Sequence, residues 1–446
     1  MPVRLIESLT TTEPLANVFS DESLIEAMLG FECALARAQA RLGVIPQAAA
    51  EAIEAAAGSG AIPGAELARE TLRAGTPAIP LVKALIERVA ARDAGAARFV
   101  HWGATSQDVA DTALVLLLKR ARALVATDHS RLQAALRELS ERHRDTVMLG
   151  RTLLQPAPPV TFGLKAAGWL AATHRGWNRV EAAFTEALTV QFGGASGTLA
   201  ALGDRGIQVG HALAEELGLT WPEAPWHAQR DRLGALVAAC GVYTGSLGKM
   251  ARDVVLLMQS EVGEAAEPGG AGRGGSSTMP HKRNPIGCTL TLAAAHRVPG
   301  LVGTYLSAMV QEHERGAGGW QAEWATIADV VQATGLAVAS MAEVAGGVVV
   351  DAGRMRANIE ATGGVIFAER VVMALAPTLG RDAAHRLLEE ASRRSIAQRR
   401  RLVEILGEMP EVSRHLSADT LRDLDSPEGY LGVAEAFRRC LISSTE

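Results

Sequence analysis

Residues 104–149 read ATSQDVADTALVLLLKRARALVATDHSRLQAALRELSERHRDTVML and contain neither glycine nor proline. A helix of ~35–40 residues at 1.5 Å per residue is about 55 Å long, which is longer than a compact domain is wide. Helices of this length are typical of elongated bundles and oligomer cores. The apolar residues that keep helical spacing are Leu114, Leu117, Ala121, Leu124, Leu132, Leu136 and Leu139.

Two further segments fit the same bundle. Residues 234–262 are apolar over most of their length, and residues 324–350 contain only two charges, Asp329 and Glu343. A helix that is apolar on most sides must be buried on most sides, and subunit association can bury it, so we expect an oligomer. Strand-type alternation is scarce and aromatic residues make up only 4% of the chain, so we expect little sheet.

A shorter helix is predicted from Leu24 to Leu42, where apolar residues recur every three or four positions. Ser20 and Asp21 offer N-cap oxygens before it, and Gly43 ends it. These features together predict an all-α fold with a central long-helix bundle.

Domain boundaries are less sharply marked. Changes of composition near 98–106 and 346–352 suggest two divisions. We therefore predict an N-terminal helical domain (1–105), a central long-helix bundle (106–350) and a C-terminal helical domain (351–446).

The composition argues against several classes of function. The 446 residues carry a net charge of −5, whereas general nucleic-acid binders carry a basic excess. The four cysteines lie far apart without a CxxC pair, so neither a zinc site nor a disulfide scaffold is indicated. The N-terminus lacks the apolar core of a signal peptide, and no uncharged apolar run reaches the ~18 residues of a membrane span. We expect a cytoplasmic protein with no nucleic-acid or membrane partner, no metal and no cofactor.

Residues 263–287, GEAAEPGGAGRGGSSTMPHKRNPIG, hold seven glycines and three prolines between two apolar helical stretches. This composition is typical of a loop, and a flexible linker is its simplest interpretation. The loop also carries Ser276, Ser277, Lys282 and Asn284. Moving a proton beside a carboxylate passes through a dianionic aci-carboxylate, which needs an acid or base and fixed donors for the new charge. These side chains can supply both.

Five sequence blocks carry a family resemblance. GSSTMPHKRNP (275–285) is similar to the signature of the fumarase/aspartase superfamily, which includes argininosuccinate and adenylosuccinate lyases. The resemblance covers nearly the whole chain and implies a three-domain α fold without a cofactor. It also implies a homotetramer around a long-helix core, with each active site built from three subunits. The other blocks are HWGATSQDVADTA (101–113), GRTLLQPAPPVTFG (150–163), QFGGASGTLAALG (191–203) and WHAQRDRL (226–233).

The resemblance also implies roles for individual residues. Ser276 matches the family's catalytic serine, while Lys282 and Asn284 would stabilise the developing charge. Arg315 offers a bidentate contact to a carboxylate, although a surface ion pair within its Glu-rich stretch is the alternative. The other expected substrate contacts are His101, Thr105, Ser106, Gln155, Ser277 and Met279.

Two arginines of the WHAQRDRL block, Arg230 and Arg232, are weaker candidates, because they can simply pair with Asp231. His101 also has a purely structural interpretation, since a lone histidine often makes only structural contacts.

One position departs from the family pattern and narrows the reaction. In the GRTLLQPAPPVTFG block (150–163), most members have a histidine directly after the threonine, where it handles the leaving-group proton. In this chain the residue at that position is Leu153. Amines and hydroxide need a proton to leave, whereas a carboxylate does not, because carboxylic acids have a pKa of about 4. The sequence therefore suits intramolecular addition of a carboxylate to a double bond, which makes a lactone. It resembles the carboxymuconate cycloisomerases, the lactonizing branch of the superfamily, which act on a small tricarboxylate.

Three other interpretations stay open. A superfamily lyase acting on adenylosuccinate or argininosuccinate would need His101 to replace the missing acid. A cycloisomerase for a differently substituted muconate, such as a sulfo analogue, fits every residue equally well. A catalytically inactive helical scaffold is the third, and the intact Ser276, Lys282 and Asn284 argue against it.

Overall fold

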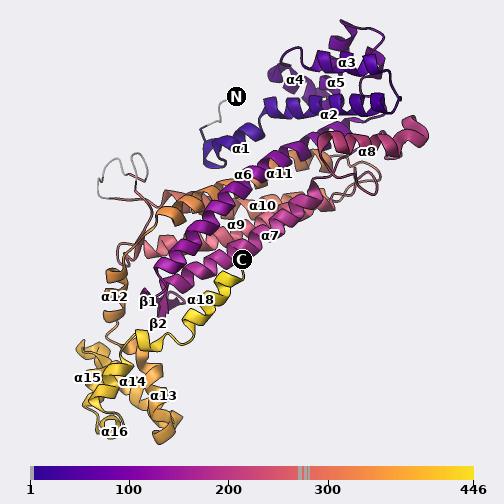
Figure 1. Cartoon of the computed structure of the whole chain (residues 1–446). Helices are drawn as coiled ribbons and strands as arrows, with labels where there is room; N and C mark the ends of the chain where they lie inside the picture. Colours follow the sequence, from indigo (N-terminus) through magenta and orange to yellow (C-terminus); the bar gives the residue numbers. More distant parts are fainter. Residues whose placement is uncertain (1–4, 270–273, 276–278, 280–281, 446) are drawn as a thin grey trace. The chain divides into compact units, whose positions relative to one another are not determined.

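The computed structural model describes residues 5–269, 274–275, 279 and 282–445. These residues are predominantly helical, which confirms the all-α prediction (Figure 1). The strands are β1 (Val147–Thr152), β2 (Gln155–Thr161), β3 (Ala265–Ala266) and β4 (Val349–Val350). The α-helices are α1 (Glu13–Val18), α2 (Asp21–Arg41), α3 (Gln47–Ala57), α4 (Gly64–Ala74), α5 (Ala78–Ala90), α6 (Ser106–Arg142), α7 (Phe162–Ala187), α8 (Gly206–Leu217), α9 (Asp231–Leu257), α10 (Ile286–Ala308), α11 (Gly319–Gly347), α12 (Ala352–Glu360), α13 (Ala368–Leu379), α14 (Arg381–Gln398), α15 (Leu402–Gly407), α16 (Pro410–Ser413), α17 (Ala418–Leu424) and α18 (Ala434–Ser443).

The predicted long helix is confirmed as α6, which is 37 residues long. The two further apolar segments are confirmed as α9 and α11, although α9 ends at Leu257 rather than near residue 262. The end of the 104–149 stretch is not helical, because β1 begins at Val147 and pairs with β2 in an antiparallel hairpin.

The chain folds into two compact units, each made of three segments. Unit 1 comprises Met1–Ser130, Arg175–Gly248 and Leu290–Ser340. Unit 2 comprises Arg131–His174, Lys249–Thr289 and Met341–Glu446. The division into three domains at residues 105 and 350 stays a prediction.

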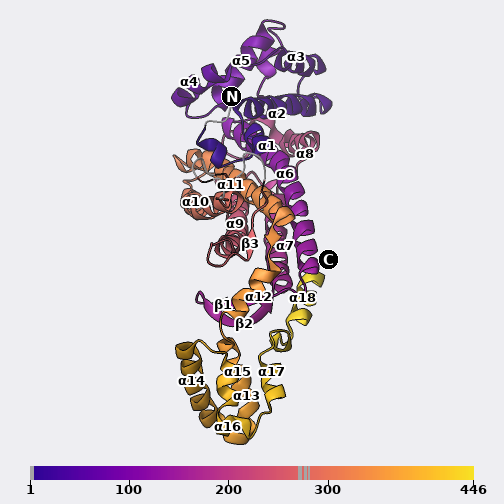
Figure 2. The ribbon, with the colours of Figure 1, turned by 90° about the vertical axis from the view of Figure 1, so that its left-hand side faces the viewer.

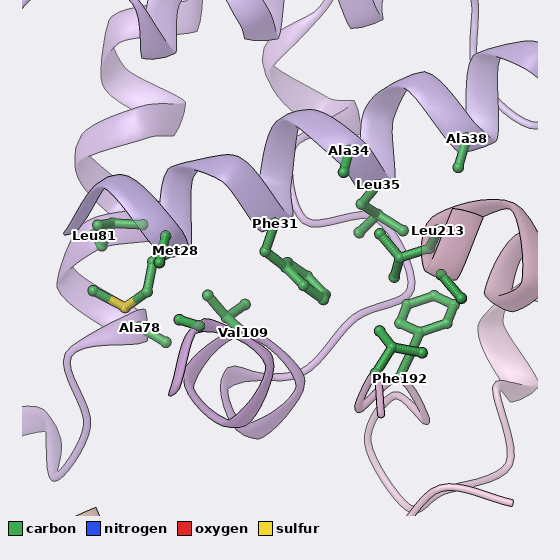
Figure 3. Packing of buried hydrophobic residues seen from close by; sticks show 14 of the residues in the cluster. Met28, Phe31, Ala34, Leu35, Ala38, Ala78, Leu81, Val109, Phe192 and Leu213 are labelled. Carbon is green, nitrogen blue, oxygen red and sulfur yellow. The ribbon is translucent and has the colours of Figure 1, made fainter. Parts of the chain in front are cut away.

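The core of unit 1 positions α2 against the start of α6. The N-cap of α2 is Ser20, as predicted, and its hydroxyl accepts a hydrogen bond from the Ser23 N–H at 3.2 Å. Burying a large apolar side chain stabilises a fold by roughly 1.5–3 kcal/mol. The side chains that α2 buries lie beside residues of α5, α6 and α8 and beside Phe192, in the segment between α7 and α8 (Figure 3). The labelled residues are Met28, Phe31, Ala34, Leu35, Ala38, Ala78, Leu81, Val109, Phe192 and Leu213.

Unit 2 has its own cores. Figure 2 shows α13 to α17 as one group, and in both views α13 packs along α14 (Figures 1 and 2). The β1–β2 hairpin buries Val147 and Leu149 against Ile359 and Phe367. The short strand β3 pairs with β4, which holds the start of the Gly-rich loop beside the residues that follow α11.

Candidate active site

The start of α6 is organised by one buried carboxylate, Asp108, which is 0% exposed. Its Oδ2 accepts hydrogen bonds from the N–H groups of Thr105 (3.0 Å) and Gly194 (2.9 Å). Its Oδ1 accepts from the Gly193 N–H (3.0 Å) and lies 2.7 Å from His227 Nε2. A buried charge is tolerated when it is paired and hydrogen-bonded in this way. Asp108 therefore joins the turn before α6 to the turn at 193–194.

Arg315 is oriented by a neutral side chain. Its Nε donates to Gln107 Oε1 (3.0 Å) and its Nη2 donates to the Ala195 carbonyl (3.1 Å). The Gln107 amide is itself fixed, because its Nε2 donates to Asp111 (3.1 Å) and to the carbonyl of His227 (2.9 Å). Within the described residues Arg315 forms no salt bridge, so the surface ion pair considered above does not occur there.

His101 has a left-handed backbone, with φ of 58°, and its ring contacts a buried carboxylate. His101 Nδ1 lies 2.6 Å from Glu32 Oε1, and Glu32, on α2, is 2% exposed. Burial alone would lower the pKa of His101, but the charge and hydrogen bond of Glu32 and the charge of Asp108 outweigh it and raise that pKa. A raised pKa keeps the ring protonated to higher pH than in an ordinary histidine.

The sequence suggested that Arg230 pairs with Asp231, but in the structure it has other partners. Its guanidinium bonds Asp111 (2.7 and 3.1 Å) and Glu323 (2.7 and 2.9 Å), and all three side chains are 0% exposed. Burial would lower the pKa of Arg230, but these two carboxylates raise it. Burial is the main cause that raises the pKa of Glu323. Arg230 is therefore a buried cation paired with two buried carboxylates.

Four predicted substrate contacts thus lie together in unit 1: His101, Thr105, Ser106 and Arg315. The side chains that support them were not predicted from the sequence. Gln107 and Asp108 lie inside the HWGATSQDVADTA block, and Glu32 interrupts the apolar stripe of α2, so the sequence does mark these three residues. It does not show which partner each side chain contacts.

Gln155 belongs to unit 2, where it is the first residue of β2 and is exposed. The hairpin turn before it consists of Leu153 and Leu154, with φ of 50° and 66°. Two left-handed residues in a two-residue hairpin are usually Asn and Gly, because leucine is strained there. Both side chains point into solvent, at 97% and 73% exposure.

The base of the Gly-rich loop is anchored in unit 2 by Glu264, which is 0% exposed. Arg151 donates to both carboxylate oxygens of Glu264, at 2.9 and 2.6 Å, and Asn358 Nδ2 donates to one of them at 2.7 Å. Bidentate arginine–carboxylate pairs are strong and directional. Since Arg151 lies on β1, the hairpin that carries Gln155 and the base of the loop are held together.

The far end of the loop is fixed at α10. The buried Glu267 carboxylate accepts hydrogen bonds from the N–H groups of Gly287 (3.0 Å) and Cys288 (2.7 Å), which caps this helix. The Asn284 N–H donates to the Gly274 carbonyl at 2.9 Å. Gly274 has φ of 65°, and a Cβ there would lie 2.6 Å from the Asn284 carbonyl oxygen, so only glycine fits.

Of the residues expected to act from this loop, the structure describes Met279, Lys282 and Asn284. The Lys282 N–H donates to the Met279 carbonyl at 3.0 Å, Met279 is 42% exposed, and Asn284 is half-buried. Ser276 and Ser277 lie outside the described residues.

Among the described residues there is no group of three or more His, Cys, Asp or Glu side chains placed to hold a metal ion. Within the same residues α11 alone has the length and mean hydropathy that a membrane span requires, and 72% of its most apolar window is buried inside the protein. A buried core helix passes the same test.

Known proteins resemble this chain along nearly its whole length. A family model described as Lyase matches residues 7–300, and one described as Adenylosuccinate lyase C-terminus matches residues 364–439. The chain is 51% identical to the 3-carboxy-cis,cis-muconate cycloisomerase of Pseudomonas aeruginosa, over 97% of this chain and 95% of that protein. It is 43% identical to the nitrosuccinate lyase of Streptomyces davaonensis, over 96% of this chain and 92% of that protein.

The likeness extends to the fold. The crystal structure of the 3-carboxy-cis,cis-muconate lactonizing enzyme from Pseudomonas putida matches with a TM-score of 0.93 and 46% identity. The match covers 99% of this chain and 98% of that one. The family resemblance predicted from the sequence blocks is confirmed.

Proposed function

Because this chain belongs to the lyase family of the fumarase/aspartase superfamily, alongside the 3-carboxy-cis,cis-muconate cycloisomerases, we propose that it converts 3-carboxy-cis,cis-muconate to 4-carboxymuconolactone. It would be an isomerase, an intramolecular lyase, in the breakdown of protocatechuate through the β-ketoadipate pathway. Family similarity alone does not choose among reactions, since a nitrosuccinate lyase is also a relative. Leu153 argues against the relatives that release an amine or hydroxide, because an aliphatic side chain cannot protonate such a leaving group. Nitrite leaves without a proton donor, and against that reaction the higher identity to the cycloisomerase, 51% compared with 43%, supports the proposal.

The proposed reaction is an addition across a double bond. One carboxylate oxygen bonds to the distal carbon, the π bond breaks, and its electron pair moves onto a second carboxylate as an aci-carboxylate. Ser276 gives a proton to the neighbouring carbon and recovers one from solvent, while Lys282 and Asn284 stabilise the transient charge, assisted by Ser277. The tricarboxylate becomes a lactone with two carboxylates, so each turnover near neutral pH takes up one proton.

The charges of unit 1 support a substrate with several carboxylates. Arg315 lacks a carboxylate partner among the described side chains, and the pKa of His101 is raised, so each can bind an anionic oxygen. Thr105, Ser106, Gln155 and Met279 complete the proposed substrate contacts. No metal or cofactor takes part in this proposal.

We propose that the active protein is a cytoplasmic homotetramer whose subunits share their active sites. The exposed Leu153 and Leu154 support this, because two large apolar side chains at one turn are costly to leave in water and suit burial against another subunit. Light scattering measures the assembly directly: a tetramer is expected, and a monomer at assay concentration would contradict the shared site.

The proposed function is tested with purified protein and 3-carboxy-cis,cis-muconate, without added metal or cofactor. Lactone formation breaks the conjugated diene, so the ultraviolet absorbance should fall in a fast and saturable way. A pH indicator should report uptake of one proton per lactone, whereas elimination of nitrite from nitrosuccinate would release one. Unchanged absorbance from a folded oligomer, with cleavage of nitrosuccinate, adenylosuccinate or argininosuccinate, would overturn the proposal.

Leu153→His tests whether the missing histidine alone separates this chain from the amine-releasing lyases. Histidine tolerates the left-handed backbone at this turn better than leucine does, so the variant should fold. We expect no new activity on adenylosuccinate or argininosuccinate, because a single proton handler does not rebuild a substrate pocket. Leu154→His is the matched control at the neighbouring turn position. Cleavage of either substrate by Leu153→His alone would show that the pocket is still shaped for a lyase.

A further inference from the structure

Two polar side chains are buried on the apolar face of α2, and both hold the same turn. Glu32 and Gln39 are 2% and 0% exposed and stand two helical turns apart. Glu32 contacts the His101 ring, and Gln39 Nε2 donates to the Trp102 carbonyl at 2.7 Å. Burying a carboxylate in such a face is costly without a charged partner. The buried apolar residues around them are Met28, Phe31, Leu35 and Ala38.

The turn held by α2 has an unusual backbone. His101 has φ of 58°, a region that non-glycine residues occupy only where the surroundings enforce it. Gly103 has φ of 77°, and a Cβ there would lie 2.8 Å from the Leu202 side chain. The chain therefore keeps a strained conformation that turns the His101 ring toward Glu32.

We propose that Glu32 is a positioning residue for the reaction: it fixes His101 Nδ1, leaves Nε2 to donate to a substrate carboxylate, and keeps the ring charged. In the part of the chain that the structure describes, His101 Nε2 has no hydrogen-bond partner. The inference rests on the proposed function, because the tricarboxylate supplies the anion. It assigns His101 to charge binding rather than to proton transfer.

The charges that act on His101 come from two helices. Glu32 lies on α2, and Asp108 lies on α6, where it also contacts His227. Replacing Glu32 by glutamine removes one of these charges and leaves burial, which lowers the pKa of His101, opposed by Asp108 alone. In that variant the imidazolium is lost at lower pH than in the wild type, and binding that needs it is lost with it.

Glu32→Gln keeps the size of the side chain and an oxygen that accepts from Nδ1–H. A hydrogen bond to a charged group is worth about 1.5–3 kcal/mol, so KM near pH 7.5 should rise roughly 10- to 100-fold. The kcat should change less, and KM should return toward the wild-type value as the pH is lowered. The measurement is kcat and KM for the muconate across pH.

Two matched variants on α2 give the controls. Glu26→Gln removes an exposed carboxylate that pairs with Arg120, and it should leave KM unchanged at every pH. Gln39→Leu removes the other side chain that holds the turn, so it should raise KM equally at every pH. A wild-type KM in Glu32→Gln, or a rise that does not depend on pH, would reduce Glu32 to a structural residue.

A measurement without turnover keeps the two proposals apart. In protein labelled at histidine, the His101 ring resonance, assigned by its loss in His101→Gln, should titrate at lower pH in Glu32→Gln than in the wild type. An unchanged titration would overturn the role of Glu32 even if the muconate is converted. A shifted titration in a protein that leaves the muconate unchanged would instead refute the proposed function alone.

Discussion

Ser276→Ala is expected to lower kcat by roughly 10²- to 10⁴-fold, the range that a positioned acid or base contributes. Alanine has no O–H to deliver to the carbon beside the aci-carboxylate, and no neighbouring group is assigned that step. The loop keeps its anchors at Glu264 and Glu267, because neither residue nor any of their hydrogen-bond partners described above is substituted, so the fold should be unaffected. The measurement is kcat at saturating muconate, with circular dichroism and light scattering on the same sample.

Ser277→Ala is the matched control, because it removes a hydroxyl at the next position of the same loop. Ser277→Ala should lower kcat far less than Ser276→Ala does, since Ser277 is assigned an assisting role. Turnover near the wild-type rate in Ser276→Ala would remove Ser276 from the proton transfer. A comparable loss in both variants would mean that the loop needs two hydroxyls and that the single assignment is wrong.

Arg230→Met is expected to lower the free energy of unfolding by about 3–5 kcal/mol, because it leaves two buried carboxylates without their cation. Asp111 keeps hydrogen bonds from Trp320 and Gln107, and Glu323 keeps one from Gln311, but none of these is charged. Unpaired buried carboxylates have raised pKa values in the folded state, so the deficit should shrink as the pH falls and they become protonated. Denaturant unfolding at several pH values measures both effects.

Arg232→Met is the control, two positions further along the chain, in the first turn of α9. Arg232 pairs with Glu223, whose side chain is 86% exposed, and exposed pairs contribute about 0–1 kcal/mol. Its loss should therefore be small and should depend little on pH. Equal destabilisation of the two variants would show that the buried network does not stabilise unit 1.

The long helices could be predicted because helix formation depends on residues three and four positions apart. The stretch around α6, which contains neither glycine nor proline, and the apolar segments of α9 and α11 show that spacing. The β1–β2 hairpin could not be predicted, because its turn is Leu153–Leu154, whereas the usual signal of such a turn is Asn-Gly. Its conformation depends on tertiary packing and not on local preference.

The candidate site, too, has features that could be predicted from the sequence and features that could not. The sequence by itself determined the all-α class, the Gly-rich loop with Ser276, Lys282 and Asn284, and the family blocks that point to His101 and Arg315. Only the tertiary structure decided what surrounds them. The separations along the chain are 69 residues for Glu32 and His101, 119 for Asp108 and His227, and 208 for Gln107 and Arg315.

Periodicity and composition describe neighbours within a few positions, so they determine elements and loops. Hydrogen bonds and ion pairs require atoms about 3 Å apart in space, and sequence distance places no limit on which atoms those are. A buried carboxylate such as Glu32 or Asp111 requires a partner, because an unpaired charge would be too costly in the core. Which partner it finds, His101 in one case and Arg230 in the other, was decided by the packing of the helices.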